Sequence, residues 1–358
     1  MNLPAALDRY RLLVCVGTGG VGKTTVSAAL ALQAAMRGRR ALVLAIDPVR
    51  ALARALGLAE LGANERVPEA ILAAAGLAPR GVLGAAMLDQ KRAWDSFVLR
   101  HAPSASVAEA LFANPFYQRL STSFAGSTEY MAIEETCRYA ESGEYDLIVL
   151  DTPPAAHALD FVHAPERIDR LLDRSVYQSI ISGAWRGAGI TARFLLRRLE
   201  HATGSSTLRD ISAFFAALDA LIDGALERTR RARALLRGGD SAFVLVTAPR
   251  QLVIEETREL QAKLAAQPTP LAAVIINRTH DVPDVDASSL DTLGSDPAAR
   301  WIRHAWADAV AEATDEREVL ARFAALLPSG TPLGEIPEAD HDLHSLRDLA
   351  LVAEGLGR

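Results

Sequence analysis

One stretch near the N-terminus constrains the fold more than any other part of the chain. Residues 14–25 read V-C-V-G-T-G-G-V-G-K-T-T, and an apolar run leads directly into the glycines. Gly17, Gly22, Lys23 and Thr24 fit the phosphate-loop pattern G-x-x-x-x-G-K-[ST]. Glycines let backbone N–H groups converge on one anion, and the helix that follows adds its N-terminal dipole. The pattern therefore predicts a strand, a phosphate loop and a helix that bind a nucleoside triphosphate.

The loop pattern also assigns roles to its residues. Lys23 is expected to act on the β- and γ-phosphates, and the Thr24 hydroxyl is expected to ligate Mg²⁺. A chance glycine-rich turn is the alternative, but strand, loop and helix signals occur in the required order. The residues expected to contact the nucleotide here are Gly17, Thr18, Gly19, Gly20, Val21, Gly22, Lys23, Thr24 and Thr25.

Two apolar runs end on an aspartate. The predicted strand at 41–46 is followed by Asp47, and the one at 147–150 by Asp151. A polar residue at the carboxyl end of a strand in an open α/β sheet faces the ligand crevice. Asp47 is therefore a candidate catalytic residue at the γ-phosphate, and Asp151 is a candidate Walker B carboxylate. With Thr24, these two aspartates form the expected Mg²⁺ site.

Composition limits the class of protein. The chain has 358 residues, 50% of them hydrophobic and 23% charged, with a net charge of −6. An acidic balance does not favour nucleic acid as a partner. Cys15 and Cys137 lie far apart and outside any C-x-x-C, which indicates a reducing compartment such as the cytoplasm. We expect neither a signal peptide nor a membrane-spanning run.

Strand and helix signals alternate along the chain. The alternation predicts a mostly parallel, doubly wound α/β sheet in a single domain over residues 1–358. Further strands are expected at 81–87, 243–247, 272–276 and 333–336, and helices at 21–36, 65–77, 88–101, 103–111, 126–141, 208–236, 252–265, 298–327 and 344–356. The four tryptophans are expected to be packing residues.

Two helical insertions, 88–125 and 165–236, are expected to form an α-helical subdomain. Within the second, residues 174–199 hold five arginines and no acidic residue, together with apolar residues and glycines. This segment either touches a membrane surface or an apolar client, or packs its apolar side on the core with solvated arginines. The sequence leaves both interpretations open.

Three segments together resemble the ArsA-type ATPases. They are the loop at 17–25, I-D-P-V-R-A-L at 46–52 and D-T-P-P-A-A-H-A-L-D-F at 151–161. That group includes arsenical-pump ATPases and the factors that deliver tail-anchored membrane proteins. The resemblance, which extends over nearly the whole chain, implies a P-loop NTPase of the SIMIBI type. It also implies ATP hydrolysis with Mg²⁺ and a dimer closed by nucleotide, either of identical chains or with a paralogue.

The resemblance implies further residue roles. Asp47 would position the attacking water, and residues 153–157 would lie in a second switch segment. Asn277 would read the adenine edge, and Pro337, which begins the loop after the last strand, is placed with it among the nucleotide-binding residues.

One position of the loop departs from the family pattern. Members typically carry a second lysine just after the first loop glycine, which reaches the partner's nucleotide. Here that position is Thr18, which has neither the charge nor the length, and Arg50 is a candidate substitute. The cysteines that bind arsenite or zinc in relatives have no counterpart.

Three functions are compatible with these features. The first is an ATPase whose cycle opens and closes a dimer and handles an apolar client or a membrane-associated partner. The second is a partition or positioning ATPase on a membrane or nucleoid. The third is a low-turnover nucleotide-binding subunit of a heterodimer, which Thr18 supports. A GTPase is disfavoured, because residues 277–280 read N-R-T-H rather than the guanine pattern [NT]-K-x-D.

Overall fold

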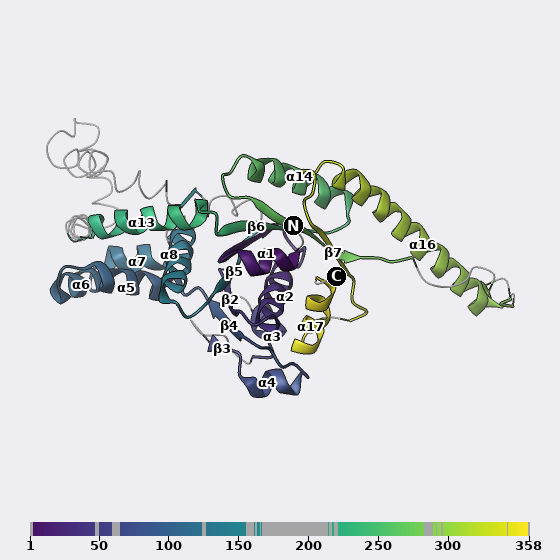
Figure 1. Cartoon of the computed structure of the whole chain (residues 1–358), viewed down its shortest axis with the longest axis horizontal. Coiled ribbons are helices and arrows are strands. Elements are labelled where there is room, and N and C mark those ends of the chain that lie inside the picture. The colour runs from purple at the N-terminus through teal and green to yellow at the C-terminus, as the bar shows by residue number, and fades with distance from the viewer. Residues whose placement is uncertain are drawn as a thin grey trace, which may run out of the picture.

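A computed structural model of the chain shows a central sheet with helices on both faces (Figure 1). The sheet has eight strands in the order β3-β4-β2-β5-β1-β6-β7-β8. Every neighbouring pair is parallel except β3–β4, which confirms the predicted mostly parallel α/β fold. The structure describes residues 3–46, 50–58, 65–123, 127–154, 221–282, 289–290, 292–294, 296–341 and 343–356, with isolated positions 161, 163, 164, 166, 214 and 217.

Apolar runs form the strands, because a parallel strand covered on both faces has to be apolar along its length. Every residue of β1, β5 and β6 is buried. Since β1 lies between β5 and β6, its carboxyl end is at the middle of one sheet edge. The strands are β1 Leu12–Gly17, β2 Arg40–Ala45, β3 Glu65–Arg66, β4 Val82–Met87, β5 Leu147–Asp151, β6 Ser241–Thr247, β7 Leu271–Thr279 and β8 Leu333–Pro337.

The core has two layers, one on each face of the sheet. Along β1, Leu13 and Cys15 belong to one cluster, and Val14 and Val16 belong to the other, as the twofold period of a strand requires. The first cluster contains the buried sides of α2 and α17, and the second those of α5, α8 and α14. The helices are α1 Leu3–Arg9, α2 Lys23–Met36, α3 Arg50–Ala55, α4 Glu69–Ala74, α5 Gln90–His101, α6 Ala105–Phe112, α7 Pro115–Ser123, α8 Ser127–Ser142, α13 Ile222–Arg237, α14 Gln251–Ala265, α16 Pro297–Ala324 and α17 Leu346–Gly355.

Five helices, α5, α6, α7, α8 and α13, gather at one side of the sheet, and we call them the helical lobe (Figure 1). A small apolar cluster that includes Val98, Leu111 and Tyr117 packs between its helices. On the opposite side, α16 projects away from the body (Figure 1). Most of 165–221 lies outside the described residues, including the arginine-rich segment 174–199, so the extent of the α-helical subdomain remains a prediction.

Several local predictions were wrong. The helix expected over 65–77 is a two-residue strand, β3, followed by the shorter α4. Pro68 caps that helix and restricts Val67 to extended backbone, and the Val67 amide donates to Leu83 at 2.9 Å. Helix α1, which was not predicted, buries Leu3 and Leu7.

The prediction that the tryptophans are packing residues is confirmed for one of them and wrong for another. Trp94 lies in an aromatic cluster with Phe97 and Tyr130, whereas Trp301 on α16 is 71% exposed. Trp185 lies outside the described residues. Of the helices that the structure describes, none is both long and apolar enough to cross a membrane.

Candidate functional site

The phosphate loop follows β1, and its backbone requires glycine at specific positions. Gly20 and Gly22 have φ values of 75° and 85°, which side chains rarely tolerate. A Cβ on Gly22 would lie 2.2 Å from Asn277 Nδ2, and one on Gly17 would lie 2.2 Å from the Val246 carbonyl oxygen. Gly22 also caps α2, so the loop turns directly into a helix N-terminus. The loop therefore has the cradle that a phosphate chain needs.

Lys23, the first residue of α2, folds back over this cradle. Its Nζ donates to the Thr18 carbonyl oxygen at 2.7 Å, and the residue is only 8% exposed. This contact holds the ammonium group against the loop backbone. Thr18 itself is 3% exposed, and its hydroxyl makes no hydrogen bond within the described part of the chain. A buried threonine does not reach out of the molecule toward a second subunit.

Two of the three predicted metal ligands lie together. Thr24 Oγ1 donates to Asp151 Oδ2 at 2.6 Å, which joins the first turn of α2 to the carboxyl end of β5. This is possible because β1 and β5 are in parallel register, with Cys15 opposite Asp151. Asp151 is 5% exposed. A hydroxyl and a carboxylate in this position fit Mg²⁺, which prefers oxygen ligands.

The third predicted ligand, Asp47, lies outside the described residues. The Ile46 amide donates to the Asp151 carbonyl oxygen at 3.2 Å, so the residue that precedes Asp47 lies beside Asp151. Thr152, which follows Asp151, donates through its hydroxyl to the Cys15 carbonyl oxygen at 2.7 Å. This anchors the start of the second predicted switch to β1; its positions 155–157 lie outside the described residues. Arg50 begins α3.

Asn277 lies against the loop from the end of β7. Its Nδ2 donates to the Val21 carbonyl oxygen at 2.8 Å, so the side chain braces the phosphate loop. Its role at the adenine edge stays a prediction. Pro337 ends β8, is exposed, and pairs with Thr279 on the neighbouring strand. Asn277 and Pro337 therefore lie at the same edge of the sheet as the loop.

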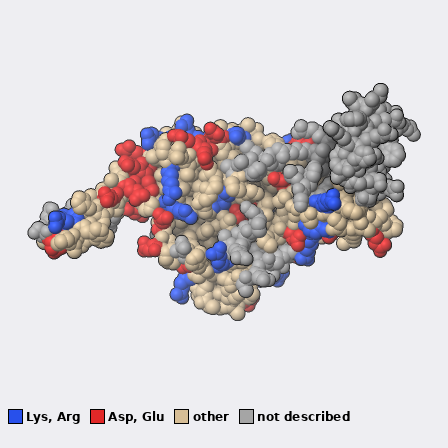
Figure 2. All heavy atoms as spheres, turned by 180° about the vertical axis from the view of Figure 1, so that it is seen from behind, with Lys and Arg blue, Asp and Glu red and all other residues tan. Residues whose placement is uncertain are grey.

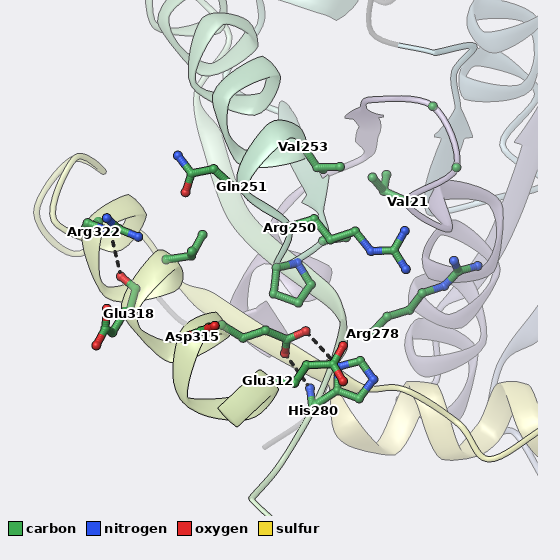
Figure 3. Close-up of a pocket in the computed structure, with 16 residues that line it drawn as sticks. Val21, Arg250, Gln251, Val253, Arg278, His280, Glu312, Asp315, Glu318 and Arg322 are labelled. Atoms are coloured by element: carbon green, nitrogen blue, oxygen red, sulfur yellow. Dashed lines mark hydrogen bonds and ion pairs between the residues drawn. The ribbon is translucent and has the colours of Figure 1, made fainter. Parts of the chain in front are cut away.

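A cavity of about 750 Å³ opens beside the loop (Figure 3). Its wall combines the loop, the turn between β6 and α14, the end of β7 and one side of α16. Several charged residues in this wall were not predicted as site residues: Arg250, Arg278, His280, Glu312, Asp315, Glu316, Glu318 and Arg322. The polar run N-R-T-H at the end of a buried strand was the signal available for Arg278 and His280.

Acidic side chains form the far wall of the cavity, and Figure 2 shows them gathered on α16 near the body. His280 Nδ1 lies 2.8 Å from Glu316 Oε1, and His280 Nε2 lies 2.7 Å from Glu338 Oε2. The hydrogen bond to Glu316 and the neighbouring carboxylates raise the pKa of His280 above its usual range. One ligand atom from each of His280, Glu312 and Glu316 lies within 4.8 Å of the other two. Among these residues, His280, Glu316 and Glu338 form an ion-pair cluster.

These features define the class of protein. A phosphate loop follows the central strand of a parallel sheet, a buried lysine lies over it, and a threonine–aspartate pair lies at its base. This arrangement is that of a P-loop NTPase. The particular family follows from comparison with known proteins: the model for anion-transporting ATPases of the ArsA type matches residues 10–295. The chain belongs to this family, which confirms the resemblance inferred from its motifs.

Individual relatives agree with the family. The chain is 32% identical to a putative arsenical pump-driving ATPase of Prosthecochloris vibrioformis, over 44% of this chain and 36% of that protein. It is 30% identical to the ATPase get3 of Aspergillus terreus, over 44% of this chain and 43% of that protein. A longer match, 26% identical, joins 77% of this chain to 76% of the ATPase GET3 of Podospora anserina. The matches to the first two thus span less than half of those proteins' own length.

Proposed function

We propose that the protein hydrolyses ATP in a Mg²⁺-dependent reaction at the phosphate loop. The observation that carries this proposal is the 2.6 Å contact between Thr24 and Asp151, where Thr24 directly follows the buried Lys23 in the chain. In this reaction, water attacks the γ-phosphorus, the bond to the β-γ bridging oxygen breaks, and ADP and phosphate leave. Such a reaction needs positioned charge rather than a covalent nucleophile.

The residues of the chain have distinct parts in this proposal. Backbone N–H groups of the loop bind the phosphates, and Lys23 offsets their charge. Thr24 and Asp151 would hold Mg²⁺, which supplies positive charge to the β- and γ-phosphate oxygens when bound. Asp47 orients the attacking water and is also proposed as a metal-site residue. Asn277 and Pro337 lie at the same sheet edge and select adenine.

We further propose that the cycle opens and closes a dimer in the cytoplasm and handles an apolar client or a membrane-associated partner. The family supports a coupled ATPase, and relatives carry the names arsenical pump-driving ATPase and GET3. The anchored Thr152 offers a fixed start for a moving switch segment. Both cysteines of the chain are free and buried, which fits a reducing compartment.

One observation favours a second candidate, a low-turnover subunit that pairs with a paralogue. Thr18 is buried, so this chain lacks the trans contact that the family pattern expects at that position. Co-purification separates the candidates: an associated paralogue that carries the missing lysine supports the heterodimer, and a nucleotide-dependent dimer of this chain alone supports the first proposal.

The catalytic proposal is tested by phosphate release from Mg·ATP. Lys23→Ala is expected to lower the rate at least about 10²-fold, because it removes a charge placed for the transition state. Asp47→Asn is expected to bind ATP and lose turnover, and removal of Mg²⁺ with a chelator is expected to abolish it. Lys263→Ala, an exposed lysine on α14, is the matched control. Equal rates for the parent, Lys23→Ala and Asp47→Asn would contradict the proposal.

A further inference from the structure

Two arginines without a role in the proposed chemistry line the cavity beside the phosphate loop. Arg250 lies at the N-cap of α14, and Arg278 lies directly after Asn277 in β7. Figure 3 shows both side chains extending toward the loop side of the cavity, where Val21 lies. Segments 28 residues apart in sequence thus bring two guanidinium groups to one wall.

Neither guanidinium is neutralised within the part of the chain that the structure describes: no ion pair or side-chain hydrogen bond engages Arg250 or Arg278 there. Across the cavity, Glu316 binds the ring and the backbone amide of His280, and Glu312, Asp315 and Glu318 line the same wall. Arg322, a third cationic residue of the wall, donates to the Glu318 carbonyl oxygen at 3.3 Å. Two unneutralised positive charges on the loop side of a cavity are suited to an anion.

The backbone of Arg278 sets it apart from an ordinary surface arginine. Its φ is 62°, and among the described residues it alone has a positive φ without being glycine. The pairing of β7 with β8 shifts register at this residue, between Asn277 and Thr279. An irregularity of this kind re-aims a side chain, and strained residues of this kind cluster at functional sites. Here the shift presents Arg278 to the cavity while Asn277 still braces the loop.

The phosphate loop carries little positive charge of its own, so further cationic side chains would help it to bind a triphosphate. Lys23 is the cationic side chain inside the loop, and the buried Thr18 adds no second charge. We propose that Arg250 and Arg278 form a guanidinium pair that binds the terminal phosphoryl oxygens of a nucleoside triphosphate held in a phosphate loop of this protein. The planar guanidinium fork matches phosphate oxygens and stays charged at any working pH. This inference rests on the proposed ATP binding and deepens it.

Equilibrium binding of Mg·ATP and Mg·ADP tests the pair, with hydrolysis as a second readout. Arg250→Ala and Arg278→Gly are the test variants, because glycine accepts the φ of residue 278 without strain. Each is expected to weaken ATP binding about tenfold, the double variant about a hundredfold, and ADP binding much less. Arg258→Ala on the exposed face of α14 is the matched control. Thermal unfolding of each variant checks that the fold is intact.

The outcomes are distinguishable from failure of the proposed function. A parent protein that binds no nucleotide overturns the proposed function, and this inference with it. A parent that binds and hydrolyses ATP while the double variant keeps the parent's ATP affinity overturns the inference alone. Equal losses for ATP and ADP also overturn it, because the pair is then not at the terminal phosphate.

A mixing experiment identifies whose nucleotide the pair contacts. The arginine double variant, which keeps Lys23, is combined with a Lys23→Ala chain, which keeps both arginines. Hydrolysis that recovers on mixing supports a pair that acts on the neighbouring subunit's nucleotide. Hydrolysis that stays at the sum of the separate chains supports a pair that acts on the nucleotide of its own chain.

Discussion

Two buried polar clusters of this molecule differ in the groups that their charged and polar side chains bind. At the phosphate loop, Lys23 and Asn277 donate to backbone carbonyl oxygens of the loop, and the cluster borders an open cavity. In the helical lobe, Glu134 of α8 accepts from Arg228 of α13 through both oxygens, each at 3.0 Å, and from Arg100 of α5 at 2.9 Å.

The lobe cluster and the loop cluster stabilise different parts of the structure. The lobe cluster joins three helices through side chains that neutralise one another, so it needs no ligand. The loop cluster fixes a backbone cradle beside a cavity whose wall includes Arg250 and Arg278, so an anion from outside the chain can complete it. Burial of charge alone therefore does not mark a binding site; an adjoining cavity is also needed.

The largest expected loss of stability comes from a substitution that breaks the lobe cluster. Arg228→Met leaves Glu134, which is 2% exposed, with Arg100 as its remaining ion-pair partner among the described residues, and the free energy of unfolding is expected to fall by about 3 kcal/mol. Burial already raises the pKa of Glu134. Loss of Arg228 raises it further, so the folded state keeps a proton that the unfolded state releases, and the destabilisation grows as pH rises. Denaturant unfolding at two pH values measures both effects.

The matched control is Arg230→Met on the same helix. Arg230 pairs with Glu227 at the exposed surface, so the change in unfolding free energy is expected to stay within about 0.5 kcal/mol. ATP affinity of folded Arg228→Met should equal that of the parent. An unchanged stability with a weakened ATP affinity would reverse the roles assigned to the two clusters.

A smaller effect is expected at the loop backbone. Gly22→Ala places a Cβ at φ 85° and 2.2 Å from Asn277 Nδ2, so it is expected to cost about 1–2 kcal/mol of stability and to weaken ATP binding. Adding Asn277→Ala removes the clash and leaves the strain, so the double variant should recover part of the loss. Gly239→Ala, which meets nothing within 4 Å, is the control. Thermal unfolding and ATP titration measure these differences.

The smallest expected effect concerns the third charged cluster, at the far wall of the cavity. The contacts of His280 with Glu316 and Glu338 raise its pKa above the usual 6.5. Their contribution to stability is therefore fully present below pH 6.5 and is lost as pH rises through the folded-state pKa. The parent should exceed His280→Gln in unfolding free energy at pH 6 and match it at pH 9.

His304→Gln, on an exposed part of α16, should follow the parent at both pH values. The effect is small because the His280 side chain is 34% exposed, and water and salt screen its ion pairs. A difference that is larger at pH 9 than at pH 6 would contradict the expected sign.

Local sequence signals were sufficient for much of the fold and for the centre of the site. The central strands form within one or two residues of the predicted runs, because continuous apolar character and strand burial coincide. Thr24 and Asp151 lie in contact, since parallel register brings the ends of neighbouring strands to one edge, and their predicted role as metal ligands stays a prediction. The loop motif and the strand ends encode these positions directly.

Other features depend on contacts between distant segments. His280 meets Glu316 and Glu338 only after β7, α16 and β8 have packed, and no local pattern encodes that meeting. The left-handed backbone of Arg278 follows from a register shift between two strands. Tertiary packing likewise stabilises the short α1, whose seven residues are too few for a stable isolated helix.

Helix α16 has a mechanical consequence for the cavity. Its 28 residues make a rod about 42 Å long, of which the C-terminal part, with Leu320 and Phe323, is buried against the body. The N-terminal part carries the exposed Trp301 and stands clear of the sheet (Figure 1). A tilt of about 5° at the buried part displaces the far tip by roughly 2–3 Å at 1.5 Å per residue. A partner that binds at Trp301 and pushes on the tip of α16 would therefore tilt this helix and shift the acidic wall of the cavity.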